Sequence, residues 1–239
     1  ETRAIILYIE SIKNGRNFIT AVRSFASSKP IMIIKSGKFD VSAHVALTHS
    51  GYLAGEDKVY DAAFERAGAI RVDETLDLFY LAESLSKQRR PKGNHLAIIT
   101  NSGGPAIIAV DTLLKLNGEL AVLSKETVES LRTHFTYLTF IHNPIDLFIE
   151  ASPKDYDIAL RGCLKDKNVD GVLIIHTPSY LPNSREIAET VVEAAKAYPY
   201  KPVFTIWMGG EQVFAAREFL SSHGIPTFVS TEQSVKSFM

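Results

Sequence analysis

The sequence has little cysteine and no excess of charge of either sign. Cys163 is the single cysteine, so an internal disulfide framework is excluded and a reducing, cytoplasmic setting is expected. Lysine and arginine number 26 and aspartate and glutamate 27, so the net charge is −1 and no basic field attracts nucleic acid. Apolar runs such as residues 4–9 and 171–175 have the length of strands and are too short to span a bilayer. We therefore expect neither nucleic acid nor a membrane as a partner.

An initiating methionine and a signal peptide are also missing. The chain starts at Glu1 and enters an apolar, strand-like segment at residue 4. We expect it to be a fragment of a longer polypeptide, because a buried strand begins almost at once. Its 239 residues are enough for one large domain or two small ones.

Short β-branched segments alternate with longer amphipathic segments along most of the chain. This alternation predicts βαβ units, in which helices cover both faces of parallel sheets. The predicted strands are residues 4–9, 30–35, 69–72, 95–100, 120–123, 171–176, 203–207 and 226–229. The predicted helices are residues 15–27, 55–67, 76–87, 105–116, 125–134, 155–164, 184–197, 211–222 and 232–238. The stretch from residue 35 to residue 55 is expected to be a loop.

A charged segment with proline and glycine interrupts this alternation at residues 87–94. Such a composition is typical of the boundary between domains. We place the boundary there, with a first domain of residues 1–91 and a second of residues 92–239. Each is expected to be a doubly wound, flavodoxin-like α/β domain with a parallel sheet.

The most informative stretch is residues 44–57, which carry His49 on the expected loop after the second strand. In open α/β sheets, ligands bind at the carboxyl ends of the strands, and Gly51 and Gly55 permit close approach by a bulky group. A neutral imidazole there is a nucleophile at pH 7, which suits a residue that carries a phosphoryl group. From residue type alone, a surface or capping histidine remains the commoner interpretation. The seven histidines show no metal-ligand spacing, so no metal site is expected.

Glu10 is a candidate partner of that histidine. It ends the first predicted strand, next to the strand whose following loop carries His49. A carboxylate bonded to one ring nitrogen fixes the tautomer and leaves the other nitrogen free to attack phosphorus. A solvated glutamate at a strand end is the structural alternative.

A glycine-rich turn after the strand at residues 95–100 forms a second candidate site. It reads Asn101-Ser102-Gly103-Gly104-Pro105, with Pro105 expected at the first helical position. The glycines allow close backbone approach, and the free N–H groups of a helix N-terminus can bind an anion. The spacing matches neither a dinucleotide fingerprint nor a Walker loop, so a plain βα turn stays open beside a phosphate site.

Two further features are interpreted structurally. Asn143 and Pro144 indicate a loop at a sheet edge, and Asp146 after them is a candidate for orienting the glycine-rich turn, although a structural turn is favoured. Cys163 falls at helical spacing with Leu160, which predicts a buried core thiol and not a nucleophile.

Residues 48–57 read Thr-His-Ser-Gly-Tyr-Leu-Ala-Gly-Glu-Asp. They closely resemble the Ser-His-Thr-Gly-small-Leu-Ala-Gly-Ser-Asp signature of ADP-forming acetyl-CoA synthetases, members of the succinyl-CoA synthetase superfamily. The departures are Thr48, Ser50, Tyr52 and Glu56, and none of them removes the nucleophile. Other segments that resemble the family are residues 7–12, 29–37, 101–106, 143–147, 207–210 and 224–226. The resemblance therefore extends over nearly the whole chain.

The resemblance implies a reversible conversion of acyl-CoA, ADP and phosphate into a small carboxylic acid, CoA and ATP. It implies that His49 carries the phosphoryl group and that Glu10 assists it. The residues implied to bind phosphate are Ser50, Gly51, Asn101, Ser102, Gly103 and Gly104. It also implies two modules whose motifs this chain lacks: a CoA-binding Rossmann domain, and an ATP-grasp domain that holds ATP or ADP with Mg²⁺. The isolated chain is then expected to fold, to hold no cofactor tightly and to be inactive, and its oligomeric state is left open.

Two other functions are kept as alternatives. One is the acyl-CoA-sensing regulatory region of a related protein lysine acetyltransferase, although such proteins commonly lack the histidine. The other is a non-catalytic, ligand-binding pair of α/β domains. Phosphorylation of His49 by an acyl phosphate would separate the three.

Overall fold

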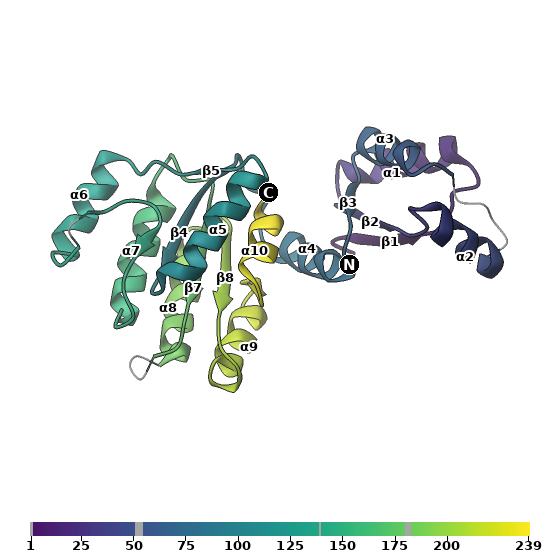
Figure 1. The fold of residues 1–239 in the computed structure, drawn as a ribbon. Coiled ribbons are helices and arrows are strands. Elements are labelled where there is room, and N and C mark those ends of the chain that lie inside the picture. Colours follow the sequence, from purple (N-terminus) through teal and green to yellow (C-terminus); the bar gives the residue numbers. More distant parts are fainter. Residues whose placement is uncertain (1, 51–54, 139, 180–182) are drawn as a thin grey trace. The chain divides into compact units, whose positions relative to one another are not determined.

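A computed structural model describes residues 2–50, 55–138, 140–179 and 183–239 (Figure 1). The chain forms two compact units, Glu1–Ser86 and Lys87–Met239, and each has its own parallel sheet. The charged segment 87–94, where we place the boundary, begins where the two units divide. Lys87 Nζ donates to the Ser221 carbonyl at 2.9 Å, and Gln88 Nε2 donates to the Gly224 carbonyl at 2.7 Å. This segment therefore packs with the second unit.

The first unit has three parallel strands in the order β1-β2-β3. Its elements are β1 (Ile5–Ile9), α1 (Gly15–Ala26), β2 (Ile31–Lys35), α2 (Asp40–Ser50), α3 (Asp57–Ala67), β3 (Ile70–Val72) and α4 (Thr75–Lys87). Asn14 caps α1 by accepting from the Asn17 N–H, and Gly68 ends α3 in the left-handed conformation with φ +76°. Helices α1 and α3 pack together, and their buried Val22 and Phe64 join strand residues in the core.

Helix α2 replaces the loop expected between residues 35 and 55, so that expectation is wrong over Asp40–Ser50. This segment contains neither glycine nor proline, and alanine and leucine favour a helix. Its apolar residues are spread around the helix, so the 3.6-residue period that reveals a packed helix is missing. Val41 and Val45 are 81% and 65% exposed, consistent with a helix whose apolar groups face solvent.

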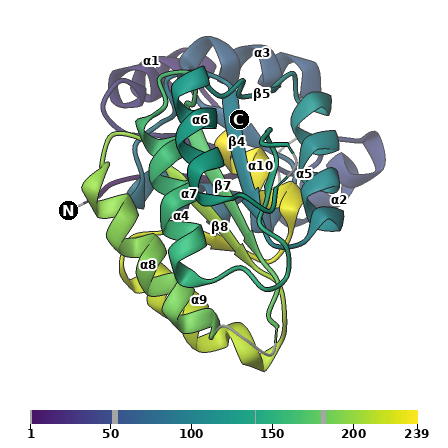
Figure 2. The same ribbon diagram turned by 90° about the vertical axis from the view of Figure 1, so that its left-hand side faces the viewer.

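The second unit contains a central sheet in the order β5-β4-β7-β8-β9, which is the flavodoxin-like order 2-1-3-4-5. Its elements are β4 (His95–Thr100), α5 (Gly103–Lys115), β5 (Glu119–Leu120), α6 (Lys125–His134), β6 (Ile145–Asp146), α7 (Pro153–Lys165), β7 (Gly171–His176), α8 (Ser184–Ala197), β8 (Val203–Trp207), the 3₁₀ turn η1 (Glu211–Val213), α9 (Phe214–Ser222), β9 (Thr227–Phe228) and α10 (Thr231–Phe238). Helices α5 and α10 pack together on one face, and α7, α8 and α9 lie on the other (Figures 1 and 2).

The core of this unit is built from strands that are apolar on both faces. Every residue of β7 and β8 is buried, as a central parallel strand requires. Cys163 on α7 is fully buried, which confirms the predicted core thiol, and burial raises its pKa to about 12. None of the helices in the described residues is long and apolar enough to cross a membrane.

One edge of β4 is shared by two very short strands. β5 pairs with the first half of β4, and β6, which the sequence pattern does not predict, pairs with the second half. The side chain of Asn143 fills the gap between them: its Oδ1 accepts from the Ile98 N–H at 2.8 Å. Its Nδ2 donates to the carbonyls of Leu96 and Ala121 at 2.7 and 3.0 Å. Asn143, which is joined to Pro144 by a cis peptide, thus completes the sheet edge where a loop is predicted.

Candidate functional site

The glycine-rich turn lies at the carboxyl edge of the second sheet. It follows β4, and β7 lies beside β4 at the point where the strand order reverses. Open α/β sheets bind ligands at this reversal point, because the two loops that leave it run in opposite directions. The turn therefore lies at the edge where open α/β sheets bind ligands, and its predicted role as a phosphate site stays a prediction.

Asn101 joins the two strands at that point. Its Nδ2 donates to the Thr177 carbonyl and its Oδ1 accepts from the Thr177 N–H, both at 2.8 Å. The residue is only 3% exposed. Its side chain therefore holds the turn against the end of β7, and its predicted contact with phosphate stays a prediction.

Helix α5 begins at Gly103, two residues earlier than expected, so Pro105 is its third residue and not its first. Proline is tolerated there because the first turn of a helix has no use for the missing donor. Ser102 precedes the helix in an extended conformation, and its side chain makes no capping hydrogen bond. The N–H groups of Gly103 and Gly104 have no acceptor within the helix, so with the Ser102 hydroxyl they can bind an anion.

Asp146 lies against this turn. Its Oδ1 accepts from the Phe148 N–H at 2.9 Å, which holds Phe148 in a left-handed conformation with φ +59°. Its Oδ2 would be 3.3 Å from a Cβ placed on Gly103. Asp146 is therefore close enough to orient the start of α5, and a side chain at position 103 would press on it.

A buried polar network lies behind the same edge, and sequence reasoning missed it. The Tyr156 hydroxyl is 3.2 Å from Nδ1 of His176, whose Nε2 is 2.9 Å from the Ser184 hydroxyl. Trp207 Nε1 donates to the Ser184 carbonyl at 3.2 Å. Burial lowers the pKa of His176 to about 4, so the ring is neutral near pH 7. The partners lie on four different elements, and no local pattern connects them.

In the first unit, the carboxyl ends of β1 and β2 bring Glu10 and Lys35 to the same edge. Lys35 is the register partner of Ile9, and Glu10 follows directly. Lys35 is 1% exposed, its Nζ donates to the Ser36 carbonyl, and it lies 4.6 Å from the centre of the Tyr60 ring. Burial lowers its pKa, although the nearby Asp57 and Glu10 carboxylates oppose the shift. Sequence reasoning assigned this lysine no role.

His49 is the second-last residue of α2 and not a loop residue. Only the backbone of His49 and Ser50 is described, and Gly51 lies outside the described residues. A helix of 11 residues is about 16 Å long, and His49 lies near the C-terminal end of α2. The predicted pairing of Glu10 with His49 stays a prediction, as do the phosphate contacts of Ser50 and Gly51.

Asp57, the last residue of the 48–57 signature, has a structural role. Arg71 on β3 donates two hydrogen bonds of 2.8 Å to the carboxylate of Asp57 and one of 2.7 Å to Asp61. These bonds fix the first turn of α3 to the sheet. The Tyr60 hydroxyl also accepts from the Ile12 N–H at 3.2 Å, which ties α3 to the connection after β1.

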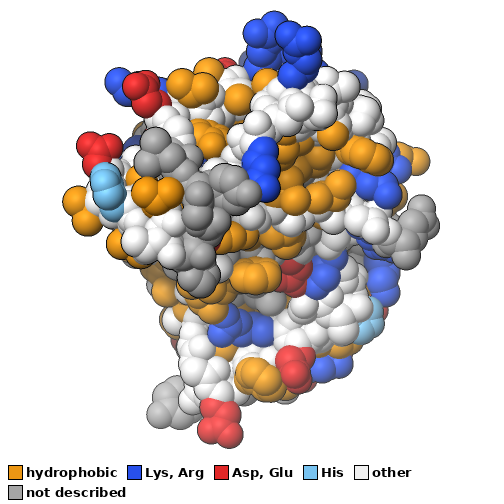
Figure 3. Space-filling view, turned by 90° about the vertical axis from the view of Figure 1, so that its right-hand side faces the viewer, with side chains coloured by type: hydrophobic (Ala, Val, Ile, Leu, Met, Phe, Trp, Pro, Cys, Tyr) orange, Lys and Arg blue, Asp and Glu red, His pale blue; other side chains and the backbone are white. Residues whose placement is uncertain are grey.

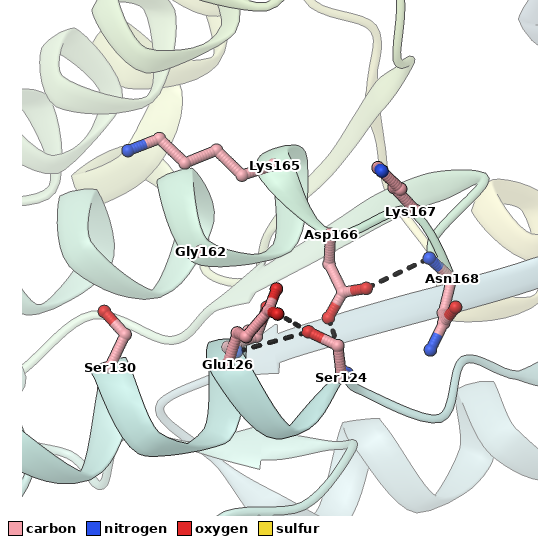
Figure 4. A pocket seen from close by; sticks show the side chains of 9 residues that line it. Ser124, Glu126, Ser130, Gly162, Lys165, Asp166, Lys167 and Asn168 are labelled. Carbon is pink, nitrogen blue, oxygen red and sulfur yellow. Dashed lines mark hydrogen bonds between the residues drawn. The ribbon is translucent and has the colours of Figure 1, made fainter.

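A further hollow of the second unit has a structural explanation. It has a volume of about 370 Å³ and lies between α6 and α7, with Asp166 at its centre (Figure 4). Asp166 accepts from the N–H groups of Ser124 and Asn168 at 2.7 and 3.0 Å, and Lys165 extends away from it (Figure 4). The polar groups that line this hollow thus cap the start of α6 and the end of α7. No group of three His, Cys, Asp or Glu side chains in the described part of the chain is placed to hold a metal ion.

Two family models match the chain. Residues 1–85 match the succinyl-CoA ligase like flavodoxin domain, and residues 96–238 match the Ligase-CoA domain. The alpha subunit of an ADP-forming acetate–CoA ligase II from Pyrococcus furiosus is 35% identical over 97% of this chain. An ADP-forming 4-hydroxybutyrate–CoA ligase from Nitrosopumilus maritimus is 31% identical over 99% of it. The matches cover 51% and 34% of these relatives, so the chain spans about half or less of their length.

A solved structure has the same fold. It is a dinucleotide forming acetyl-coenzyme A synthetase 1 of Ca. Korarchaeum cryptofilum in complex with phosphate and ADP. The TM-score is 0.93 at 27% identity, and the match covers 99% of this chain and 52% of that one. The predicted class of two α/β domains with parallel sheets is confirmed, and so is the predicted resemblance to ADP-forming acetyl-CoA synthetases.

Proposed function

Because the chain belongs to the Ligase-CoA domain family, we propose that it is the phosphohistidine-carrying part of an ADP-forming acyl-CoA synthetase. The complete enzyme would interconvert acyl-CoA, ADP and phosphate with a carboxylic acid, CoA and ATP. His49 would accept a phosphoryl group from the acyl phosphate and pass it to ADP. The observation that carries the proposal is the position of His49 at the far end of an exposed helix.

Helix α2 suits a residue that must serve two sites. Among the described residues, α2 shares no extended packing interface with another helix or strand. Its Val41 and Val45 are exposed, as is Phe39 just before it. Little packing would be lost if the helix changed its position, so it could bring His49 to one site and then to another.

The start of α5 would bind a phosphoryl group in the complete enzyme. The free N–H groups of Gly103 and Gly104 and the Ser102 hydroxyl are donors that a phosphoryl group needs, and the helix dipole adds to them. Asp146 on β6 would keep this turn in place. So would the hydrogen bonds of Asn101 to Thr177, the residue after β7. The relative from Ca. Korarchaeum cryptofilum, which was solved with phosphate and ADP, supports the assignment of a phosphate site to this fold.

Glu10 would act on the imidazole itself. Bound to one ring nitrogen, its carboxylate would hold the tautomer in which the other nitrogen attacks phosphorus. It would also stabilise the positive charge that the ring gains on phosphorylation. The position of Glu10 at the carboxyl edge of the first sheet is compatible with this role.

The remaining substrates would bind outside this chain. We assign CoA to a Rossmann domain, and ATP or ADP with Mg²⁺ to an ATP-grasp domain or subunit, in the cytoplasm. The Pyrococcus relative is named as an alpha subunit, which supports a further subunit. Hydrophobic side chains lie among charged ones on the face of the first unit in Figure 3, and exposed apolar groups there suit contact with such modules.

Labelling of His49 tests the proposal. The full-length protein with its other modules, incubated with ATP and Mg²⁺ or with acyl phosphate, should gain an acid-labile, base-stable phosphate. His49→Asn should abolish the label, and His44→Asn, which alters an exposed histidine on the same helix, should keep it. Equal labelling of His49→Asn and the wild type would place the phosphorylation elsewhere and overturn the proposal.

A further inference from the structure

Lys35 is a buried cation at the carboxyl edge of the first sheet. It ends β2, next to Ile9 of β1, and only 1% of its surface is exposed. One hydrogen bond to the Ser36 carbonyl and the face of the Tyr60 ring are its polar contacts in the described residues. An ammonium has three donors, so these contacts leave hydrogen-bonding capacity unused.

No carboxylate in the described part of the chain forms an ion pair with Lys35. Asp57 is the acid with the largest influence on the pKa of Lys35. Both of its carboxylate oxygens accept hydrogen bonds of 2.8 Å from Arg71. Glu10 acts on Lys35 through charge at a distance. Buried charges in proteins are normally paired or bind a ligand, because an unpaired buried charge is strongly destabilising. Among the residues that the structure describes, Lys35 therefore has no counter-ion in an ion pair, although it is buried.

Ser36, the next residue, also has a side-chain hydrogen-bond donor that the described residues leave unused. The Ser36 hydroxyl is buried and has no hydrogen-bond partner in the described part of the chain. The backbone of Ser36 is used, since its N–H donates to the Ile9 carbonyl at 3.0 Å. Two unsatisfied donors on consecutive residues, one charged and one neutral, match the needs of a single anion.

One residue beside Lys35 also lines a cavity of the first unit. A cavity of about 340 Å³ lies between the start of α1 and the start of α3, and Tyr60, Ile12 and Gly55 line it. Tyr60 thus contacts both: its side chain lines the cavity, and its ring centre lies 4.6 Å from the Lys35 ammonium.

We propose that Lys35 and Ser36 form an anion-binding site for a phosphoryl group at the carboxyl edge of the first sheet. The inference rests on the proposed function, in which a phosphoryl group is transferred by His49 on the same unit. A phosphoryl dianion gains more from a buried ammonium than a carboxylate does, because the Coulomb energy scales with charge. The Ser36 hydroxyl supplies the second donor, and the bound anion neutralises Lys35.

The test uses the 239-residue chain and inorganic phosphate, with the ¹³Cε resonance of Lys35 assigned through Lys35→Arg. Phosphate should shift this resonance saturably, whereas chloride at equal ionic strength should leave it in place. Ser36→Ala should weaken binding about tenfold, as expected for loss of one hydrogen bond to a charged group. Lys58→Met is the control, because Lys58 is an exposed lysine on α3 and its loss should not alter binding.

Two results would overturn the site. The Lys35 resonance could remain unmoved at phosphate concentrations that shift amides of the 101–104 turn, or acetate could shift it as strongly as phosphate. Neither result would change the labelling of His49, which is measured separately in the full-length protein. A loss of His49 labelling with phosphate binding intact at Lys35 would instead reject the proposed function and keep the site.

Discussion

The Asn101 side chain and the Thr177 main chain form two reciprocal hydrogen bonds of 2.8 Å across the reversal point of the second sheet. A single buried amide thus satisfies both the N–H and the carbonyl of the residue that follows the neighbouring strand β7. The glycine-rich turn begins at this amide, so its position relative to β7 depends on it. A plain βα turn would not need such a bridge.

Asn101→Ala should destabilise the second unit by about 2–4 kcal/mol, because it removes a buried side chain and leaves two half-buried backbone groups of Thr177 without these partners. Urea unfolding of the chain measures this loss. Asn168→Ala is the matched control: its amide makes one exposed hydrogen bond to the Val122 carbonyl, so the loss should stay under about 1 kcal/mol. Similar losses in the two variants would show that the bridge does not hold the turn.

Gly103 and Gly104 should respond differently to the same substitution. Nothing lies within 4 Å of a Cβ at position 104, so Gly104→Ala should stabilise the chain by about 0.5 kcal/mol through helix propensity. At position 103 the new methyl would lie 3.3 Å from Asp146 Oδ2, so Gly103→Ala should forfeit this gain. Thermal unfolding compares the two, and an equal gain in both would mean that Asp146 does not press on the turn.

His176 should make the stability of the second unit depend on pH. Burial lowers its folded-state pKa to about 4, below the 6.5 of an unperturbed histidine. Between these values the unfolded chain binds the proton and the folded chain does not, so stability is complete above pH 6.5 and falls as pH drops toward 4. The loss should reach up to about 3 kcal/mol at 1.36 kcal/mol per pH unit.

The contribution of His176 is read as a difference, because carboxylates also titrate in this range. His176→Gln should be less stable than the wild type at pH 7, since it disturbs the contacts with Tyr156 and Ser184. It should also lose less stability between pH 6.5 and 4.5 than the wild type does. His44→Asn, at an exposed histidine, should keep the wild-type slope. An unchanged slope in His176→Gln would assign the pH dependence to other groups.

The sequence predicts best those helices and strands whose apolar pattern and end signals are both visible along the chain. The bounds of β4, β7, β8, α6 and α8 agree with the prediction. Apolar runs that end at turn residues define these strands, and Ser124 and Asn183 cap the two helices with their side chains. Local chemistry is sufficient in these cases, because start, stop and periodicity are all visible along the chain.

Elements that depend on distant partners could not be predicted. β6 is two residues long and exists because Ile145 and Asp146 pair with the end of β4. Helix α2 buries no single face, so its sequence lacks a helical period. The same limit applies to the site: the glycines of residues 101–104 are visible as composition, but the burial of Lys35 and His176 follows from packing alone.

Arg71 should matter more to the first unit than a surface ion pair does. Arg71→Met removes three hydrogen bonds to Asp57 and Asp61 and should cost about 2–3 kcal/mol. Lys38→Met removes an ion pair with Asp73, a largely exposed carboxylate, and should cost under about 1 kcal/mol. Urea unfolding separates the two. Equal, small losses would show that the bonds of Arg71 do not fix the start of α3.

Glu10→Gln should slow phosphorylation of His49 in the full-length protein by roughly 10²–10⁴-fold, the effect of losing a positioned acid-base partner. The amide keeps the size of the side chain and removes the charge that would hold the ring tautomer. Rapid-quench measurement of phosphohistidine formation from acyl phosphate gives the rate. Glu65→Gln, which neutralises an exposed carboxylate on α3, is the matched control and should keep the wild-type rate.

A structural role for Glu10 predicts a different pattern. If Glu10 only supports the end of β1, Glu10→Gln should lower the thermal unfolding temperature and leave the rate per folded molecule unchanged. If it acts on the imidazole, the fold should keep its stability while the rate falls, and the loss should appear with acyl phosphate and with ATP as donors, because both phosphorylate the same ring. Wild-type rates with both donors would remove Glu10 from the mechanism.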